Sequence, residues 1–370
     1  MLGAERRPPY DRPPLSKQFL AGAWEADRVA LRVDEAVVAD LRLGVRATGL
    51  DLVTREITVD GGDRHATERL PFDALLVATG ARPRVLPGTD GLDGVFTLRT
   101  FDDCVALREA LAGRPRVAVI GAGFIGSEVA ATCRGLGLDV TVIEALDLPL
   151  VRVLGTAMGE VCAAVHRDHG TGLRLGVGVQ AVEGADRAER VRLADGSAVE
   201  ADVVVVGIGV APVTDWLDGS ELAVADGVVC DRHCRAAPGV YAAGDVARWE
   251  NPLFGEAMRI EHWTNAVEMG TYAAGRMLQD ADGGGSEDGG FAPVPYFWSD
   301  QYDRKIQFVG HVSGAGAPVV VEGSVEDRRF VAAYGRDGRL VAALSMNMPH
   351  RIMAYRAMIA AGTPFPPPGP

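Results

Sequence analysis

Three glycines, Gly121, Gly123 and Gly126, stand in the spacing G-x-G-x-x-G. In a dinucleotide-binding turn such glycines permit a tight bend, a close backbone approach to a pyrophosphate, and close packing of a helix on a strand. Glu144 follows about 20 residues later, where a carboxylate can accept hydrogen bonds from ribose hydroxyls. The spacing therefore predicts a dinucleotide site.

The charge of Glu144 indicates which dinucleotide this site prefers. Its carboxylate would repel a 2′-phosphate, and the three residues that follow it, at 145–147, include no base. Arg152 is the nearest cation and lies within a short loop's reach. The sequence therefore favours NADH over NADPH.

Lys17 is one of only two lysines in a chain whose other 35 basic residues are arginines. Lysine is a compact charge whose pKa can be shifted, so its presence here suggests a specific role. The alternative is an ordinary solvated lysine on the surface. The prolines of DRPPLSKQFL are expected to fix an extended backbone that holds Arg12 and Lys17 in place.

The elements around the glycine turn form one predicted βαβ unit. Val117 to Ile120 is an apolar run typical of a buried strand, and Val140 to Ile143 is another. Between them, apolar and small residues, including Ile125, recur at helical spacing until Gly135. This arrangement places the glycines between a strand and the start of a helix.

The rest of the chain predicts more strands than helices. Antiparallel strands are expected in 31–60, buried strands in 71–80, 203–212 and 239–245, further strands in 171–206 with a turn at Asp195-Gly196, and a strand-rich segment from 296 that closes with a helix at 350–361. A helix is expected to begin in 259–270, and the glycine-rich stretch 280–290 is typical of a linker.

Three of these strands end in residues that suit a cofactor. Gly80, Gly209 and Gly244 follow apolar runs, and the carboxyl ends of strands are where α/β proteins bind nucleotides. Asp245 can accept hydrogen bonds from a polyol, or it can simply cap a helix.

The first residues, MLGAE, repeat the pattern of VTVIE, a strand end followed by an acid. Glu5 would then bind a ribose, and a strand, a glycine turn and a helix of roughly 30 residues would be expected before it. On this interpretation the chain lacks an N-terminal glycine motif.

Composition and charge restrict the class of protein. A chain of 370 residues with 48% hydrophobic and 24% charged residues is typical of a soluble globular protein. The longest apolar run is too short to span a bilayer, and residues 1–9 contain no signal region, which predicts a cytoplasmic protein with no membrane partner. A net charge of −13 argues against nucleic acid as a partner.

The charge is also unevenly distributed. Residues 291–370 contain eight Arg or Lys and six Asp or Glu, a net charge of +2 that leaves −15 for the remainder. This segment is a candidate docking face for an acidic partner, although a solvated surface of mixed charge would have the same composition.

The five cysteines do not suggest redox or metal chemistry. None forms C-x-x-C, which argues against a redox dithiol. Cys230 and Cys234 flank His233, but no second pair of ligands stands at zinc spacing, so no metal site is expected.

Six motifs occur in a single order: RPPLSK, ATGARPR, GAGFIGSE, VGIGVAP, YAAGD and YFWSDQYD. Together they resemble the FAD-dependent, NADH-linked ferredoxin and rubredoxin reductases that supply electrons to oxygenases and bacterial cytochromes P450. The resemblance implies an α/β fold with two dinucleotide-binding, Rossmann-like domains and a C-terminal α+β interface domain. The FAD domain, 1–98 and 224–290, would be split by the NAD domain, 99–223, with the interface domain at 291–370.

The resemblance also implies roles for individual residues. FAD contacts would be Glu5, Arg12, Lys17, Thr79, Gly80, Gly244, Asp245, Trp263 and Trp298, and NAD contacts would be Gly121, Gly123, Ile125, Gly126, Glu128, Glu144, Arg152 and Gly209. The two tryptophans match positions near the isoalloxazine ring, although a large aromatic is more often part of a core.

Lys17 and Glu128 match a pair that the family places beside flavin N5. Hydride arriving at N5 makes the ring negative, and a fixed ammonium stabilises that charge while Glu128 holds the lysine and contacts the nicotinamide. The alternative for Glu128 is a carboxylate of the first helical turn that is favoured by the helix dipole.

The function predicted by the resemblance is electron transfer from NADH through FAD to a [2Fe-2S] ferredoxin or a rubredoxin. Two alternatives stay open at this point. One is a related reductase of a small acceptor such as a quinone or monodehydroascorbate, and the other is a truncated, non-catalytic NAD-binding remnant. The sequence leaves the oligomeric state open.

Overall fold

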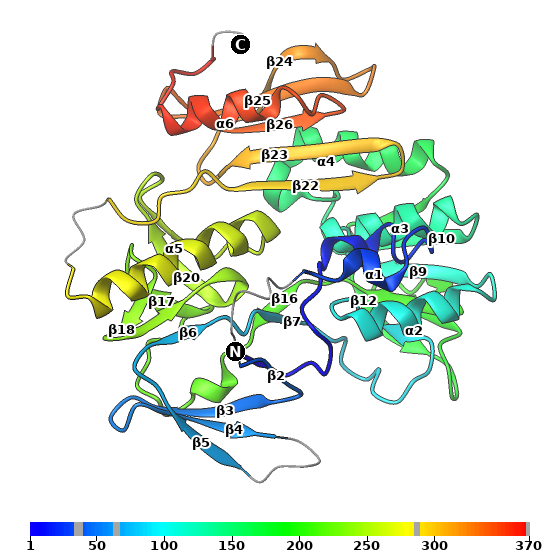
Figure 1. Cartoon of the computed structure of the whole chain (residues 1–370). Helices are drawn as coiled ribbons and strands as arrows, with labels where there is room; N and C mark the ends of the chain where they lie inside the picture. The colour runs from blue at the N-terminus through cyan, green and yellow to red at the C-terminus, as the bar shows by residue number, and fades with distance from the viewer. Residues whose placement is uncertain (33–39, 62–66, 285–288, 368–370) are drawn as a thin grey trace. The chain divides into compact units, whose positions relative to one another are not determined.

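The computed structural model describes residues 1–32, 40–61, 67–284 and 289–367 (Figure 1). Its contacts divide the chain into two compact units. The first unit comprises Met1–Asp11, Ala30–Arg82 and Ala211–Pro295, and the second comprises Arg12–Val29, Pro83–Val210 and Tyr296–Pro370. The predicted division into four domain segments stays a prediction.

The second unit contains a five-stranded parallel sheet in the order β11-β10-β9-β15-β8. Its strands are β8 (Val95–Phe96), β9 (Arg116–Ile120), β10 (Asp139–Glu144), β11 (Gly172–Leu175) and β15 (Val203–Val206). Its helices are α2 (Phe101–Leu111), α3 (Phe124–Gly135) and α4 (Val151–Asp168). The predicted βαβ unit is confirmed, because β9 and β10 pair in parallel with α3 between them.

The central strands of this sheet are apolar because they are buried on both faces, as strands of parallel sheets usually are. Val119 of β9 pairs with Val142 of β10 and with Val205 of β15, and all three side chains are buried. An antiparallel sheet of β12 (Val179–Glu183), β13 (Arg190–Leu193) and β14 (Ala198–Glu200) adds to this unit. The turn expected at Asp195-Gly196 joins its last two strands.

The C-terminal part of the second unit is an antiparallel sheet in the order β22-β23-β26-β25-β24. Its strands are β22 (Tyr296–Gln301), β23 (Arg304–Gly310), β24 (Val319–Ser324), β25 (Arg329–Arg336) and β26 (Arg339–Met346), followed by α6 (Ile352–Ala360). Leu154 and Met158 of α4 join Phe308, Phe330 and Leu344 of this sheet in one apolar core. The strand-rich segment and its closing helix are therefore confirmed.

The segment that carries Lys17 is helical and not extended, so that expectation was wrong. Residues 13–16 form the 3-10 helix η1 (Pro13–Ser16), which is followed by α1 (Ala26–Val29). Proline fixes φ near −65°, a value that suits the first turn of a helix as well as an extended chain. Here the first of the two prolines begins the helix, and the backbone N–H of Leu15 donates to the carbonyl of Arg12 at 2.9 Å.

The first unit is built from small sheets and one long helix. These are the pair β1 (Leu2–Gly3) and β2 (Arg42–Leu43); the sheet of β3 (Arg46–Asp51), β4 (Glu56–Asp60) and β5 (Glu68–Pro71); the sheet of β6 (Leu75–Val77), β18 (Arg235–Ala237) and β19 (Val240–Ala242); the sheet of β17 (Val228–Cys230), β20 (Ala247–Asn251) and β21 (Glu256–Met258); η3 (Asp215–Leu217) and η4 (Gly244–Val246); and α5 (Trp263–Ala281). The antiparallel strands expected in 31–60 are confirmed in β3 and β4, while 33–39 lie outside the described residues.

Several predicted boundaries were wrong by a few residues. The strand expected in 71–80 is only β6, and the one expected in 203–212 divides into β15 and β16 (Val210–Pro212), because Gly209 takes a φ of +94°. The short strand β7 (Ala81–Pro83) follows Gly80. The helix expected from 259 begins at Trp263 and continues to Ala281, into the predicted linker, of which 285–288 lie outside the described residues.

No helix within the described ranges is both long and apolar enough to cross a bilayer.

Candidate functional site

The glycine turn of the second unit connects β9 to α3, and its packing demands two of the three glycines. Gly121 has a φ of +99°, and a Cβ on it would lie 2.3 Å from the carbonyl oxygen of Gly207. A Cβ on Gly126 would lie 2.0 Å from the carbonyl oxygen of Gly121. Any side chain at either position would force the backbone of the turn to move.

Gly123 is different, because no contact within the described residues requires it to be glycine. Its φ is −75°, and a Cβ built on it would meet no atom within 4 Å. Gly123 is the N-cap residue of α3, where unpaired backbone N–H groups and the helix dipole favour an anion. An open cradle that a Cβ would fill, at a helix N-terminus, fits the pyrophosphate of a dinucleotide.

Glu144 ends β10 and is hydrogen-bonded to the glycine turn. Its Oε2 accepts from the backbone N–H of Ala122 at 2.7 Å, and its Oε1 accepts from that of Leu146 at 2.9 Å. A carboxylate has about four acceptor sites, so two stay available for ribose hydroxyls. Arg152 lies exposed on the first turn of α4, and its proposed role beside this site stays a prediction.

Two apolar side chains are exposed just beyond the ends of β9 and β15, one on the first turn of α3 and one in the loop after β15. The two strands pair in parallel and so end at one edge of the sheet. Ile125 is 44% exposed and Ile208 is 38% exposed. Ile208 lies between Gly207 and Gly209, and a Cβ on Gly209 would also meet nothing within 4 Å. Ile208 was not predicted as a site residue, although its position between two glycines at a strand end could have indicated it.

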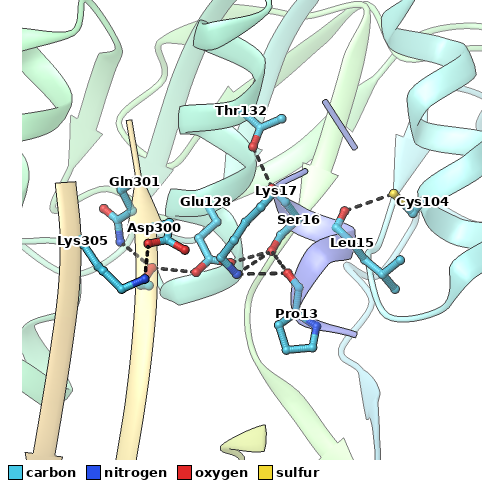
Figure 2. A network of polar contacts seen from close by, with 11 residues as sticks. Pro13, Leu15, Ser16, Lys17, Cys104, Glu128, Thr132, Asp300, Gln301 and Lys305 are labelled. Carbon is cyan, nitrogen blue, oxygen red and sulfur yellow. Dashed lines mark hydrogen bonds and ion pairs between the residues drawn. The ribbon is translucent and has the colours of Figure 1, made fainter. Parts of the chain in front are cut away.

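Lys17 and Glu128 form a buried ion pair in the second unit (Figure 2). Lys17 Nζ lies 2.6 Å from Glu128 Oε2, and the two side chains are only 10% and 3% exposed. Lys17 is therefore not a solvated lysine on the surface. Glu128 is likewise buried, and it lies past the first turn of α3, which begins at Phe124.

Two hydroxyls complete the surroundings of the Glu128 carboxylate. Ser16 Oγ donates to Oε2 at 2.5 Å, and Ser299 Oγ donates to Oε1 at 2.7 Å. Burial raises the pKa of Glu128 above 4.5, and the Lys17 charge and these hydrogen bonds act in the opposite direction. A buried ion pair is expensive to desolvate and is worth keeping only when such partners satisfy it.

The 3-10 helix that carries Lys17 is fixed at three points of its backbone (Figure 2). Lys17 Nζ donates to the carbonyl of Pro13 at 3.1 Å. Thr132 Oγ1 of α3 donates to the carbonyl of Ser16 at 2.8 Å, and Cys104 Sγ of α2 donates to that of Leu15 at 3.1 Å. The ammonium group is thus held in place by both its side chain and its backbone.

Ser16, Ser299 and Gln301 were missed at the sequence level. Gln301 Nε2 donates to Ser299 Oγ at 3.1 Å, which extends the network along β22. Ser299 and Gln301 are two residues apart on a strand, so their side chains share a face. That alternation in WSDQ was the available signal, but the partner of this face was not visible in the sequence.

In the first unit, two strands bring predicted FAD residues to one edge. β6 and β19 pair in parallel, with Leu75 opposite Val240 and Val77 opposite Ala242. Gly80 follows β6 with a φ of +67°, and Gly244 follows β19 with a φ of +75°. Asp245 comes next, in η4, and is partly buried. Glycines and an acid at the carboxyl ends of adjacent parallel strands fit a nucleotide cofactor.

The other predicted FAD residues of the first unit have polar partners. Glu5 accepts a hydrogen bond from the Tyr10 hydroxyl at 2.5 Å, and Trp263 Nε1 donates to Asp11 Oδ1 at 3.0 Å. Thr79 is exposed, and its Oγ1 donates to the carbonyl of Val213 at 2.7 Å.

Arg12 and Trp298 belong to the second unit. Arg12 Nη1 donates to the carbonyl of Arg99 at 2.7 Å. Trp298 of β22 stacks on Tyr296, with ring centroids 6.2 Å apart. The predicted FAD residues therefore come from both units, whereas the predicted NAD residues all belong to the second.

The five cysteines are all buried. Burial raises the pKa of the Cys104, Cys133, Cys162 and Cys230 thiols to about 12, and it also raises that of Cys234. Because the thiolate is the reactive form, these thiols are poor redox groups at neutral pH.

The chain matches two known families along most of its length. Residues 1–270 match the family described as pyridine nucleotide-disulphide oxidoreductase, and residues 296–368 match the one described as reductase C-terminal. The chain belongs to the pyridine nucleotide-disulphide oxidoreductases. The predicted α/β fold is thereby confirmed, with two Rossmann-like domains and a C-terminal α+β domain.

Relatives within this family of oxidoreductases include reductases of oxygenase systems. The chain is 38% identical over 369 residues to the ferredoxin–NAD(+) reductase component of the anthranilate 1,2-dioxygenase system of Burkholderia cepacia, covering 98% of this chain and 87% of that protein. It is 36% identical to rhodocoxin reductase of Rhodococcus erythropolis, covering 99% and 84%.

Solved structures of similar proteins agree with this assignment. The covalent complex of putidaredoxin reductase with putidaredoxin matches with a TM-score of 0.90 and 30% identity, covering 98% of this chain and 87% of that one. The structure of Fdr9 matches with a TM-score of 0.85 and 41% identity, covering 98% and 88%. The resemblance drawn from the six motifs is confirmed.

Proposed function

We propose that the protein passes electrons from NADH through FAD to a small iron–sulfur protein, a ferredoxin of an oxygenase or cytochrome P450 system. The observation that carries the proposal is the buried ion pair of Lys17 and Glu128, which lies in the unit that also contains the glycine turn. Glu128 lies on α3, two residues after Gly126, the last glycine of the G-x-G-x-x-G motif.

The chain's own residues would bind NADH at the edge of the parallel sheet. Gly123 leaves room for the pyrophosphate at the N-terminus of α3, and Glu144 has acceptor sites left for ribose hydroxyls. Ile125 and Ile208 offer exposed apolar surface that a bound dinucleotide would cover. These features support dinucleotide binding.

When bound, FAD supplies the capacity to accept two electrons from NADH and release them one at a time. Gly80, Gly244 and Asp245 would hold it from the ends of β6 and β19. Lys17 would stabilise the negative charge that develops at flavin N5, and Glu128 keeps the ammonium in position. Arg12, Trp263 and Trp298 remain proposed contacts of the same cofactor.

NADH is the proposed coenzyme in preference to NADPH. The Glu144 carboxylate is anchored by two backbone N–H groups, so it cannot swing away from a 2′-phosphate without breaking both hydrogen bonds. Arg152 is exposed on α4 and is the nearest candidate in the sequence to offset that charge.

The acceptor is proposed to be an iron–sulfur protein and not a disulfide. All five thiols are buried with a raised pKa, which leaves the protein without a reactive dithiol. Relatives that match the chain along nearly its whole length include ferredoxin–NAD(+) reductases of dioxygenase systems. The net charge of +2 in 291–370, against −15 elsewhere, supports docking of an acidic partner there.

A comparison of acceptors tests this proposal. NADH oxidation by the full chain, supplemented with FAD, is measured with oxygen alone, with a [2Fe-2S] ferredoxin, with a rubredoxin and with a quinone, and each assay is repeated with NADPH. We expect the ferredoxin to stimulate NADH oxidation strongly, the stimulation to fall as salt is added, and NADPH to be the poorer donor. A quinone that stimulates while the ferredoxin does not would contradict the proposed acceptor.

The division into four domain segments and the cytoplasmic location also remain proposals. The first would be tested by limited proteolysis between the segments, and the second by fractionation of cells that express the protein.

A further inference from the structure

The two oxygens of the Glu128 carboxylate have different partners. Oε2 accepts from Lys17 and Ser16, both in the N-terminal segment. Oε1 accepts from Ser299 of β22, which is its single donor among the described residues. Glu128, 2% exposed, and Ser299, 0% exposed, are closed off from water, so no solvent molecule at the surface can replace that donor.

Gln301 determines which way the Ser299 hydroxyl points. The amide nitrogen Nε2 of Gln301 can donate hydrogen bonds but cannot accept them, and it donates to Ser299 Oγ at 3.1 Å. Because Ser299 Oγ accepts there, its own proton is free to be donated to Glu128 Oε1. The opposite orientation of the amide would turn the Ser299 proton toward Gln301 and leave Glu128 Oε1 without a donor. Gln301 Oε1 is buried without a partner in the described part of the chain, which is the cost of this arrangement.

The strand that carries Ser299 is itself fixed to the helices of the second unit. Phe297 of β22 packs against Phe124 of α3, with ring centroids 4.3 Å apart. The hydroxyl of Tyr302, at the turn after β22, lies 2.7 Å from His166 Nδ1 and 2.7 Å from Thr171 Oγ1. The Ser299 hydroxyl therefore lies on a strand that has little freedom to move away from Glu128.

We propose that Ser299 is a positioning residue for the Lys17–Glu128 pair. Its hydroxyl holds Glu128 Oε1, so that the carboxylate stays ionised with Oε2 directed at the Lys17 ammonium. Gln301 assists by orienting that hydroxyl. The inference rests on the proposed function in one respect, namely that the ion pair takes part in the oxidation of NADH.

Other charges around Glu128 do not substitute for Ser299. Lys17, which directly follows η1, already contacts Oε2. On the β22–β23 hairpin, Asp300 and Lys305 pair with each other, with 3.3 Å between Lys305 Nζ and Asp300 Oδ1. On α4, His166 contacts Ser127, the residue before Glu128, through Nε2 at 3.3 Å. None of these groups donates to Oε1.

The test measures the protonation of Glu128 directly and does not require turnover. Infrared difference spectra of the 370-residue chain are recorded across a pH range, and the carboxyl band of Glu128 is assigned by its loss in Glu128→Gln. In Ser299→Ala we expect the titration midpoint of Glu128 to rise by about one to two pH units, the effect of losing one hydrogen bond to a charged group.

Ser345→Ala is the matched control. Ser345 lies on β26 of the same sheet, is 0% exposed, and has an Oγ that makes no hydrogen bond within the described residues. Its side chain lies on the opposite face of that sheet from Ser299, since Ser299 is in register with Ile306 and Met346 whereas Ser345 is opposite Gln307. The variant loses the same buried atom and should titrate as the wild type does. An unchanged midpoint in Ser299→Ala, or an equal rise in Ser345→Ala, would overturn the inference.

Two further measurements keep the result interpretable. If Ser299→Ala does not fold, Ser299→Cys, a weaker donor of similar size, should raise the midpoint in the same direction, and an unchanged midpoint there would count against the inference. A wild-type protein that fails to oxidise NADH would overturn the proposed function, and the infrared titration would still decide whether Ser299 holds Glu128.

Discussion

Burial of two opposite charges is the residue-scale feature that needs most explanation. Lys17 and Glu128 are nearly inaccessible, and replacing such a pair by apolar side chains often leaves a protein equally or more stable. Stability alone therefore does not account for the pair. A role in stabilising a developing negative charge does account for the pair, because a fixed ammonium acts strongly in a site that is shielded from water.

His166 makes the stability of the second unit depend on pH. Its ring is fully buried between the Tyr302 hydroxyl and Ser127 Oγ, and burial, followed by the charge of His169, lowers its pKa from 6.5 to about 4. The unfolded chain binds a proton first as pH falls, so stability is lost between pH 6.5 and about pH 4. Between about pH 7 and about pH 5 we expect a loss of about 2 kcal/mol in the free energy of unfolding.

Urea unfolding of the wild type and of His166→Gln at these two pH values checks the prediction. The variant should lose about 2 kcal/mol less than the wild type on acidification, because its side chain does not titrate. His350→Gln is the control, since His350 is an exposed histidine of the same unit and its variant should behave as the wild type does. An acid loss that is equal in wild type and His166→Gln would show that the buried ring is not responsible.

The residues that act on Glu128 illustrate what the sequence could and could not predict. Lys17 and Glu128 were predicted, because a rare lysine and a glycine motif are local signals. Ser16 and Ser299 were not, because they stand 112 and 171 residues from Glu128 and a serine carries no signal by itself. Only the folded chain shows which hydroxyls reach the carboxylate.

At the scale of the element, the turn after β9 and the first turn of α3 combine two kinds of glycine. Gly126 is required by packing, since its Cβ would lie 2.0 Å from a carbonyl oxygen, whereas Gly123 has open space around it. In Gly126→Ala the turn must shift, and we expect a loss of about 1–3 kcal/mol in stability. In Gly123→Ala we expect a change in stability below about 1 kcal/mol.

Binding of NADH should show the reverse contrast. The methyl group added by Gly123→Ala would obstruct only a ligand, so this variant should fold normally and bind NADH about tenfold more weakly, the effect of one lost hydrogen bond to a phosphate. Fluorescence titration with NADH and urea unfolding separate the two effects. Wild-type affinity in folded Gly123→Ala would contradict the proposed position of the pyrophosphate.

Elements were predicted well where the pattern was local and repeated. β9, α3 and β10 follow from apolar periodicity and from the glycines that bound them. η1 was predicted wrongly because the φ value of proline suits two conformations, and only the contacts of Leu15 and Ser16 with α2 and α3 select the helical one. Local sequence does not contain those contacts.

For the molecule as a whole, the second unit collects segments from the start, middle and end of the chain around one carboxylate. η1 supplies Ser16 and is followed directly by Lys17, and α3 supplies Glu128 (Figure 2). Strand β22 supplies Ser299. Residues so far apart in sequence meet only when the N-terminal segment, the parallel sheet with its helices and the C-terminal sheet have all folded. The proposed electron transfer is therefore a property of the assembled unit and not of the glycine motif by itself.

The most direct test of the central claim is an anaerobic stopped-flow measurement of flavin absorbance after NADH is mixed with the FAD-loaded protein. Three proteins are compared: the wild type, Lys17→Gln and Lys305→Gln. Lys305, the other lysine, is 44% exposed and pairs with Asp300, so it controls for loss of a positive charge. The unfolding free energy of each protein shows that it is folded.

We expect NADH to bleach the flavin of the wild type and of Lys305→Gln at similar rates. Lys17→Gln should be slower by a factor on the order of a hundred, the effect of removing one fixed group that stabilises developing charge. If folded Lys17→Gln is bleached as fast as the wild type, or if NADH bleaches none of the three, the proposed role of the Lys17–Glu128 pair is wrong.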